Sequence, residues 1–357
     1  MKIGILTFHC AHNYGAVLQC YALQETLKAM GHEVEVIDYR PNFLLLPYKV
    51  WDIHRYTAYN SFFRSILECL KLYRRLVRYR AFNSFIKTRL NLTKEQTISS
   101  SFDIYIMGSD QIWNPGITKG FHKPYFGYFD FPKGSRKYIA YAASMETSFL
   151  DKEAEGFYAK ALDNFDAVSV REQMLADLLQ PLTLKKIETV LDPTLLADAA
   201  IWHAIAKQPP VDYKYVLVYQ VIYNESTRII AQNVANQIGA KVVEVTAWVD
   251  RKYRANVYQC CSPEEFLGWI KYASCIVTTS FHGTAFSVIF NKPFYCIKFG
   301  GDTRSLSLLQ MLGLEYRMIT QTFYQSFQTI DYQAVNMRLV DLQKKSYKYL
   351  VSSLVSC

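Results

Sequence analysis

Residues 274–293 of the chain read SCIVTTSFHGTAFSVIFNKP. The β-branched, apolar run 275–278 predicts a buried strand, and the apolar run 284–290 predicts the helix that follows it. Between them, Ser280-Phe-His282-Gly283 places a histidine at a strand end, before a helix amino terminus. Open α/β sheets bind their ligands at such positions. His282 either caps the helix or serves a functional site, and the surrounding sequence favours the site.

The same alternation of strand and helix recurs along the chain. A strand over 3–8, a helix over 17–30 and a strand over 33–39 form a β-α-β unit, which nearly always gives a right-handed crossover into a parallel sheet. Further central strands are predicted over 102–107, 137–143, 167–170, 214–223, 241–246 and 294–299. The pattern predicts an α/β protein with two Rossmann-like domains that face a cleft.

The chain has 357 residues, of which 50% are hydrophobic, so it has enough material for two cores. We expect an N-terminal domain over 1–196, which carries a basic, aromatic helical insertion at about 44–92. The C-terminal domain covers 197–328 and contains the Ser-Phe-His-Gly sequence. Residues 329–357 are expected to form a terminal helical segment.

Cysteine use and hydropathy indicate the compartment. The eight cysteines include no CxxC pair, so neither a zinc site nor a disulfide framework is expected. The apolar start of the chain is too short for a signal peptide, and no run of about 18 apolar residues predicts a membrane span. We expect a cytoplasmic protein.

The positive charge is concentrated in one region. Residues 49–89 contain ten Lys or Arg residues against Asp52 and Glu68, and many aromatic residues. Such a segment can lie on an anionic membrane surface, here the inner face. The alternative is a helical pair whose aromatics pack on the domain while its cations face water, and the sequence does not decide between the two. Nucleic acid is not an expected partner, since no nucleic-acid motif is present.

Polar side chains gather where predicted strands end. The loop 9–16 lacks the GxGxxG pattern of dinucleotide sites, yet offers an amide and helix N–H groups to an anionic or hydroxylated ligand. Simple helix capping by Asn13 is the alternative. The polar candidates are Asn13, Gln19, Asp110, Gln111, Asn114, Arg171, Ser280, His282, Asp302 and Arg304.

These candidates contain one good acid/base, His282, with arginines that can hold oxyanions. DxD, metal-ligand spacing and GxxxxGK[ST] are all absent from the sequence, so no metal or nucleoside triphosphate is expected. The motifs alone predict group transfer from a phosphorylated or carboxylated small donor.

Five motifs in order resemble the polysaccharide pyruvyl transferase family. They are Asn13-Tyr-Gly-Ala-Val-Leu-Gln19, Gly108-Ser-Asp-Gln-Ile-Trp-Asn-Pro115, Ser169-Val-Arg-Glu172, Leu191-Asp-Pro-Thr-Leu195 and the segment Ser280 to Pro293. The likeness spans roughly residues 1 to 320, and the combination is specific although each motif alone is weak. It implies a two-domain fold similar to that of GT-B glycosyltransferases. Gly15, Gly108, Ser109 and Gly283 join the candidate substrate-binding residues.

The resemblance implies transfer of a pyruvyl group from phosphoenolpyruvate to a pair of sugar hydroxyls as a ketal, in cell-surface polysaccharide biosynthesis. The acceptor would be a saccharide or a lipid-linked saccharide, and no cofactor is required. By resemblance His282 is the general acid and Arg171 binds the donor. Some members have Arg-Leu-His-Gly where this chain has Ser280-Phe-His-Gly, and Arg304 or Lys298 is the candidate replacement for the missing arginine.

Two other functions are compatible with the sequence. A glycosyltransferase that uses a nucleotide sugar could have the same fold, although the second domain lacks an acidic motif suited to such a donor. A non-catalytic carbohydrate-binding subunit is the third hypothesis, to which only the missing arginine points.

Overall fold

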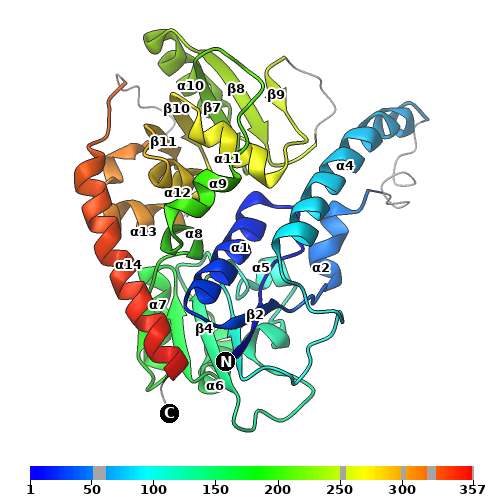
Figure 1. Cartoon of the computed structure of the whole chain (residues 1–357), viewed down its shortest axis with the longest axis vertical. Helices are drawn as coiled ribbons and strands as arrows, with labels where there is room; N and C mark the ends of the chain where they lie inside the picture. Colours follow the sequence, from blue (N-terminus) through cyan, green and yellow to red (C-terminus); the bar gives the residue numbers. More distant parts are fainter. Residues whose placement is uncertain (51–61, 250–254, 299–302, 320–326, 356–357) are drawn as a thin grey trace.

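The computed structural model describes the chain except residues 51–61, 250–254, 299–302, 320–326 and 356–357. In the described residues the main strands form two six-stranded sheets, one in each half of the chain, and neighbouring strands are parallel throughout. The two sheets lie at opposite ends of the long axis of the molecule (Figure 1). The predicted fold class, two Rossmann-like α/β units, is confirmed.

The first sheet has the strand order β2-β1-β3-β4-β5-β6. Its strands are β1 (Lys2–Leu6), β2 (Glu33–Val36), β3 (Ile104–Met107), β4 (Lys137–Ala143), β5 (Ala167–Val170) and β6 (Ile187–Thr189). The helical segments of this half are α1 (Tyr14–Ala29), α2 (Asn42–Leu45), η1 (Leu46–Tyr48), α4 (Phe62–Arg89), α5 (Pro115–Thr118), η2 (Lys123–Phe126), α6 (Lys152–Asp163), α7 (Gln173–Leu179) and η3 (Gln180–Leu182).

The second sheet has the order β12-β11-β10-β7-β8-β9, which is the strand order of dinucleotide-binding folds when counted from β7. Its strands are β7 (Tyr215–Gln220), β8 (Lys241–Thr246), β9 (Val257–Tyr258), β10 (Cys275–Thr278), β11 (Phe294–Ile297) and β12 (Met318–Ile319). Its helical segments are α10 (Glu225–Ile238), α11 (Pro263–Lys271), α12 (Phe281–Ile289), α13 (Thr303–Leu312) and η4 (Glu315–Arg317).

Two helices begin earlier than the apolar pattern predicts, because polar residues cap them. Asn13 accepts hydrogen bonds from the N–H groups of Gly15 and Ala16, so α1 begins at Tyr14 rather than at 17. Ser280 accepts one from the N–H of Gly283, so α12 begins at Phe281. His282 therefore lies in the first turn of the helix and not in the loop before it.

The two halves share apolar packing. Helices α8 (Pro193–Leu196) and α9 (Ala199–Ile205) connect them, and Trp202 of α9 contacts both Tyr21 and Phe286. One hydrophobic cluster runs from Ile3 of the first sheet to Ile276 of the second. The last helix, α14 (Tyr332–Val355), runs alongside both halves in Figure 1. The predicted domain limits themselves stay a prediction.

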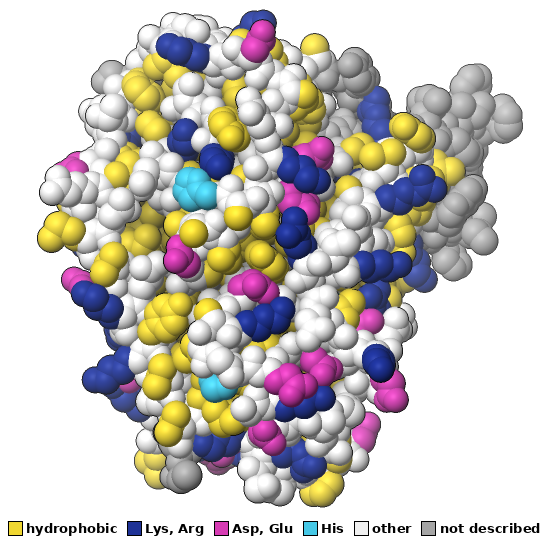
Figure 2. Space-filling model, viewed as in Figure 1, with side chains coloured by type: hydrophobic (Ala, Val, Ile, Leu, Met, Phe, Trp, Pro, Cys, Tyr) yellow, Lys and Arg dark blue, Asp and Glu magenta, His cyan; other side chains and the backbone are white. Residues whose placement is uncertain are grey.

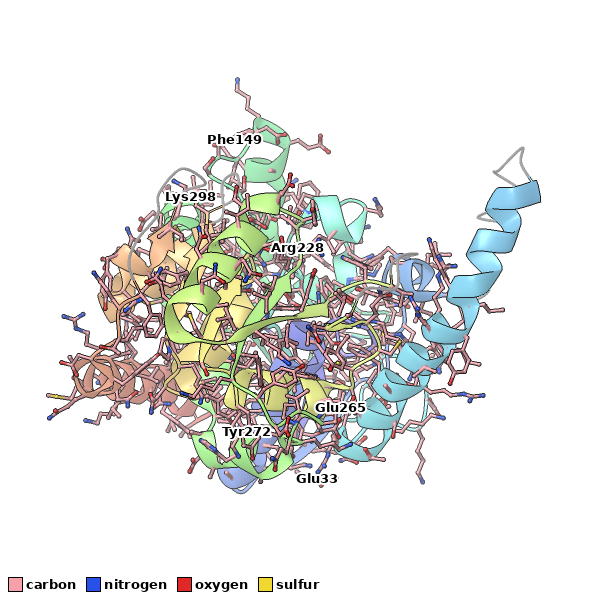
Figure 3. All side chains as sticks on the ribbon, turned by 90° about the horizontal axis from the view of Figure 1, so that it is seen from above. Glu33, Phe149, Arg228, Glu265, Tyr272 and Lys298 are labelled. Atoms are coloured by element: carbon pink, nitrogen blue, oxygen red, sulfur yellow. The ribbon has the colours of Figure 1, made fainter. Side chains whose placement is uncertain are left out.

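The insertion contributes one long helix, α4. Its carboxyl-terminal half packs through Phe82, Phe85 and Ile86, which are buried. Its amino-terminal part extends away from the body of the molecule (Figures 1 and 3), and Lys and Arg side chains lie along that edge (Figure 2). Residues 51–61 of the predicted membrane-contacting segment lie outside the described residues. Among the helices that the structure describes, none is both long and apolar enough to cross a bilayer.

Candidate active site

Three of the candidate segments follow strands at which the sheet order reverses. The first sheet reverses between β1 and β3, and the second between β7 and β10. Open α/β sheets bind ligands outside the carboxyl ends of such strands. The loop before Asn13, the turn Gly108–Ser109 and the end of β10 at Ser280 all lie at these two points, so the chain crossings bring together motifs that are far apart in the sequence.

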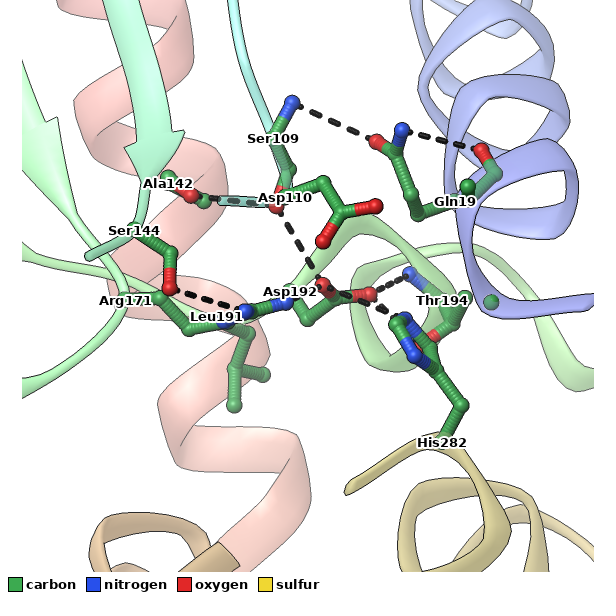
Figure 4. A network of polar contacts seen from close by, with 12 residues as sticks. Gln19, Ser109, Asp110, Ala142, Ser144, Arg171, Leu191, Asp192, Thr194 and His282 are labelled. Atoms are coloured by element: carbon green, nitrogen blue, oxygen red, sulfur yellow. Dashed lines mark hydrogen bonds and ion pairs between the residues drawn. The ribbon is translucent and has the colours of Figure 1, made fainter. Parts of the chain in front are cut away.

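His282 lies where the two halves meet. A Cβ atom added to Gly15 of α1 would lie 2.0 Å from Nδ1 of His282, so only glycine allows this approach. On the other side of the ring, Nε2 lies 3.7 Å from Oδ2 of Asp192 (Figure 4). This distance fits an ion pair with a protonated imidazole but exceeds that of a hydrogen bond. Nε2 is buried and has no hydrogen-bond partner among the described residues.

Asp192 is the centre of the polar network in Figure 4. Its Oδ2 accepts a hydrogen bond from Arg171 Nη1 at 2.7 Å and lies 3.2 Å from the hydroxyl of Ser109. Its Oδ1 accepts from the N–H and the hydroxyl of Thr194, at 2.9 and 2.7 Å. Burial alone would raise the pKa of Asp192, but the adjoining His282 imidazole and Arg171 guanidinium outweigh it and hold that pKa well below its ordinary value. Asp192 is therefore a buried carboxylate at neutral pH.

Arg171 is fully enclosed by partners. Its guanidinium pairs with Asp192, lies 3.3 Å from Glu172 through Nε, and donates to the Ser144 hydroxyl at 2.9 Å. It also lies over the Phe281 ring, 4.5 Å from the centroid. Burial would lower the pKa of Arg171, yet the two carboxylates raise it above its ordinary value. Arg171 is thus permanently charged and locked between the first sheet and α12.

Glu172 is the weaker acid of the two carboxylates that contact Arg171. Ser144 donates to its Oε1 at 2.6 Å, whereas Oε2 is buried without a hydrogen-bond partner among the described residues. Burial raises the pKa of Glu172 above its ordinary value, although Arg171 and the Ser144 hydroxyl oppose this shift. Of the two carboxylates beside Arg171, Glu172 is the one that takes up a proton more easily.

The turn after β3 joins the same network. The Ser109 N–H donates to Gln19 Oε1 at 3.3 Å, and Gln19 Nε2 donates in turn to the Thr7 hydroxyl at 2.8 Å. Gly108 has a positive φ of 130°, and a Cβ there would lie 2.1 Å from the carbonyl oxygen of Tyr141. Asp110 adopts the left-handed region with φ 70°. The Gly108-Ser-Asp sequence is therefore needed to bring Ser109 to Asp192.

Other predicted residues have local structural roles. Asn114 caps α5 through the Gly116 N–H, and its Nδ2 donates to Gln111 Oε1 at 2.6 Å. Asn13 and Ser280 cap α1 and α12, and a ligand-binding role for Asn13 stays a prediction. Gly283 packs against Thr278, whose Oγ1 would lie 2.3 Å from an added Cβ.

The arginine proposed to replace the missing one lies at the same junction. Arg304 of α13 pairs with Glu146 of the first half at 2.9 Å. Its positive charge also lowers the pKa of Glu172, so it lies within electrostatic range of the Arg171 group. Lys298 is exposed, and Asp302 lies outside the described residues.

The sequence alone did not single out four members of the network: Ser144, Glu172, Asp192 and Thr194. Asp192 lies inside one of the family motifs, but Asp-Pro before an apolar run is also an ordinary helix start, and Asp192 does cap α8. Its distance to His282 depends on how the two halves pack, which no local pattern encodes.

Comparisons with known proteins complete these observations. Among solved structures, the fold is similar to a UDP-N-acetylglucosamine 2-epimerase from Rickettsia bellii, with 10% identity, a TM-score of 0.48, and coverage of 99% of this chain and 96% of that one. It is also similar to the glycosyltransferase SnogD from Streptomyces nogalater, with 11% identity, a TM-score of 0.44, and coverage of 98% and 95%. No curated protein matches the chain.

The sequence profile of one family, described as polysaccharide pyruvyl transferase, matches residues 13–299. The match includes Asn13 and Gly15, the Gly108 turn, Arg171, Asp192 and the His282 motif, which the structure gathers at one junction. The chain belongs to the polysaccharide pyruvyl transferase family and is a transferase.

Proposed function

We propose that this protein transfers a pyruvyl group from phosphoenolpyruvate to two hydroxyls of a saccharide, forming a cyclic ketal during cell-surface polysaccharide biosynthesis. One observation carries the proposal. The buried Nε2 of His282 has no hydrogen-bond partner among the described residues, and the Asp192 carboxylate lies 3.7 Å away. A buried nitrogen without a hydrogen-bond partner is available to a bound group, and here it faces a buried anion.

The reaction requires one proton donor and two hydroxyl additions. The first sugar hydroxyl adds to C2 of the enolpyruvyl group while C3 takes up a proton and becomes a methyl group. The C2–O bond to phosphate then breaks, and the second hydroxyl adds to C2. One hydroxyl proton offsets the proton placed on C3 and the other leaves with phosphate, so the products are the ketal and hydrogen phosphate.

In this proposal His282 protonates C3 as the general acid. The Asp192 carboxylate stabilises the imidazolium form, and the close packing against Gly15 fixes the ring plane. Asp192 acts through His282 and is a positioning residue.

Arg171 is proposed to bind the carboxylate or phosphate of the donor. Its present partner Glu172 has a raised pKa, so the approach of an anionic donor would favour protonation of Glu172 and leave the guanidinium for the donor. Arg304, which forms a half-buried ion pair with Glu146, is proposed as the second cation of the donor site. No cofactor is part of this mechanism.

The proposed acceptor is a saccharide, free or lipid-linked, and the proposed location is the cytoplasm with peripheral contact at the inner membrane face. The basic helix α4 supports this location, because clusters of Lys and Arg attract anionic lipid headgroups. In the described part of α4, Tyr73 is 75% exposed and Tyr79 is 42% exposed. Aromatic side chains exposed beside cations are typical of interfacial helices.

Phosphate release and acceptor mass gain test the function. The purified protein is mixed with phosphoenolpyruvate and with galactose-, mannose- and N-acetylhexosamine-terminated acceptors. We expect His282→Ala to lower the rate by about 10²–10⁴-fold, the usual contribution of a general acid. His203→Ala, which changes an exposed histidine of α9, is the matched control and should retain full activity. Full activity of His282→Ala would refute the assignment, and stabilisation by a nucleotide sugar without any response to phosphoenolpyruvate would favour a glycosyltransferase.

A further inference from the structure

A small cavity lies near the domain junction, and His282 is not among its lining residues. Its volume is about 90 Å³, and it is formed between the loop after β1, the insertion and the end of β8. The lining residues are His12, Pro47, Tyr48, Lys49, Arg75, Arg78, Tyr79, Trp248 and Val249. Three of these are cations, and no carboxylate is among them. The cavity is too small to enclose a saccharide, but it suits a compact charged group.

Arg78 provides a buried positive charge at this cavity. The residue is 6% exposed, and its guanidinium donates to the Tyr14 hydroxyl and to the carbonyl oxygens of Thr246, Gln259 and His12, at 3.0 to 3.4 Å. All four acceptors are neutral. A buried cation that has no carboxylate partner among the described residues is costly, and its field favours an anion nearby.

The neighbouring groups respond to this charge. Burial, together with the charges of Arg78 and Arg40, lowers the pKa of His12 to about 4, so the imidazole is neutral at pH 7. Burial raises the pKa of Tyr48 to about 12, with Arg78 opposing and Asp110 adding to the shift. Because the charge of Asp110 raises the pKa of Tyr48, the cavity lies within electrostatic range of the turn that follows β3.

One wall of the cavity is an aromatic pair that bridges the two halves. The rings of Tyr48 and Trp248 stack with centroids 5.8 Å apart and planes 5° from parallel. Trp248 remains 49% exposed, so one part of the indole is open to solvent. An exposed indole face beside cations can pack against the C–H face of a sugar whose attached anion meets the cations.

We propose that this cavity binds the phosphate of a glycosyl phosphate or diphosphate, with the sugar ring packed on Trp248. The inference rests on the proposed function and adds that the acceptor is presented in a phosphate-linked form. Lys49 and Arg78 supply the positive charge, while Tyr48 and Trp248 supply the apolar contact. Because the Tyr48–Trp248 pair joins both halves, a bound acceptor would also hold them together.

Isothermal titration of the full-length protein tests the site. The probes are galactose 1-phosphate, methyl galactoside, uridine monophosphate and a short isoprenyl diphosphate galactose. We expect galactose 1-phosphate to bind at least about tenfold more tightly than methyl galactoside and to weaken as salt rises. Trp248→Ala and Lys49→Ala should each weaken it by about five- to tenfold.

Two control variants match these changes. Tyr272→Ala removes another exposed aromatic ring, 44% accessible and labelled in Figure 3, and Lys94→Ala removes an exposed cation outside the cavity. Both should bind galactose 1-phosphate within about twofold of the wild type. Tighter binding of the isoprenyl diphosphate than of galactose 1-phosphate would identify a lipid-linked acceptor, and equal binding a soluble sugar phosphate.

Three results would overturn the proposal: equal binding of methyl galactoside, unchanged affinity in both cavity variants, or preference for uridine monophosphate over galactose 1-phosphate. These results are separate from the test of the proposed function. Phosphate release that depends on phosphoenolpyruvate and His282 would stand even if the cavity bound no sugar phosphate. Conversely, binding at the cavity would be measurable in a protein that does not use phosphoenolpyruvate.

Discussion

Gly15 and His282 touch across the junction between the two halves of the protein. A Cβ added to Gly15 would lie 2.0 Å from Nδ1 and 2.4 Å from Cε1 of the imidazole, well inside van der Waals contact. The first turn of α1 thus forms one wall of the histidine site. The position of the ring depends on the absence of a side chain at Gly15.

Gly15→Ala is predicted to displace the His282 ring or to separate α1 from α12. Because shifts of about 1 Å at a reacting group cost roughly 100-fold in rate, we expect a loss of that order. The overpacking should also lower the free energy of unfolding by about 1–3 kcal/mol. Gly156→Ala is the control, since a Cβ there meets nothing within 4 Å and should stabilise α6 by about 0.5–1 kcal/mol. Activity equal to wild type in Gly15→Ala would contradict the geometry.

Asp192→Asn is predicted to destabilise the protein by about 3–5 kcal/mol at pH 7, because it leaves Arg171 buried without its main counter-charge. The folded-state pKa of Asp192 is depressed, so its stabilisation is present above the unfolded value near 4 and disappears as pH falls toward the folded value. The difference between wild type and variant should therefore shrink below about pH 4. Urea unfolding at pH 7 and pH 3 measures it, and an equal penalty at both would be evidence against a buried carboxylate.

Glu172→Gln is predicted to show the opposite pH trend. The pKa of Glu172 is raised, so its contribution is fully present below the unfolded value of about 4.3 and is lost as pH rises through the folded value. The stability of the variant relative to wild type should therefore improve between pH 4 and pH 7. Urea midpoints at the two pH values test this, and a larger loss at pH 7 than at pH 4 would show that Glu172 is a stabilising anion.

Arg78→Met is predicted to lower the free energy of unfolding by about 2–4 kcal/mol, because three buried acceptors and the half-buried Thr246 carbonyl at the end of β8 lose their donor. Arg80→Met, an exposed change two residues along the same helix, should stay within about 0.5 kcal/mol. Chemical unfolding curves of the two variants measure the difference. Equal free energies of unfolding for Arg78→Met and Arg80→Met would mean that the hydrogen bonds of Arg78 do not stabilise the contact between the two halves.

Contact of α4 with anionic membranes predicts co-flotation with vesicles rich in phosphatidylglycerol but not with neutral vesicles. Deleting residues 49–89 is not a clean test, because Phe82, Phe85 and Ile86 are buried in the core. Arg80→Glu should instead lower the bound fraction about fivefold or more, at roughly 1 kcal/mol per charge. Lys94→Glu makes the same charge change elsewhere and serves as the control. Equal flotation with both vesicle types would exclude this role.

The fold could be predicted from the sequence because its signals are local. The run Cys275–Thr278 forms a strand over the predicted residues, and the predicted strand over 137–143 is observed over Lys137–Ala143. Buried parallel strands are continuous apolar runs, and helices carry their own capping residues, so neither needs distant contacts to be recognised. The helix starts were less accurate, because Asn13 and Ser280 begin their helices before the apolar pattern does.

The sequence by itself determined the strand and helix order and the family motifs, and it singled out His282 as the candidate acid/base. Only the tertiary structure placed Asp192 beside His282, enclosed Arg171 between two carboxylates, and inserted Arg78 of the basic segment between the halves. Except for Arg171 with its sequence neighbour Glu172, each of these contacts joins residues that are far apart in the chain. Periodicity records which face of an element is buried, but the partner of a buried charge is decided by how the elements pack, and burial then sets its pKa.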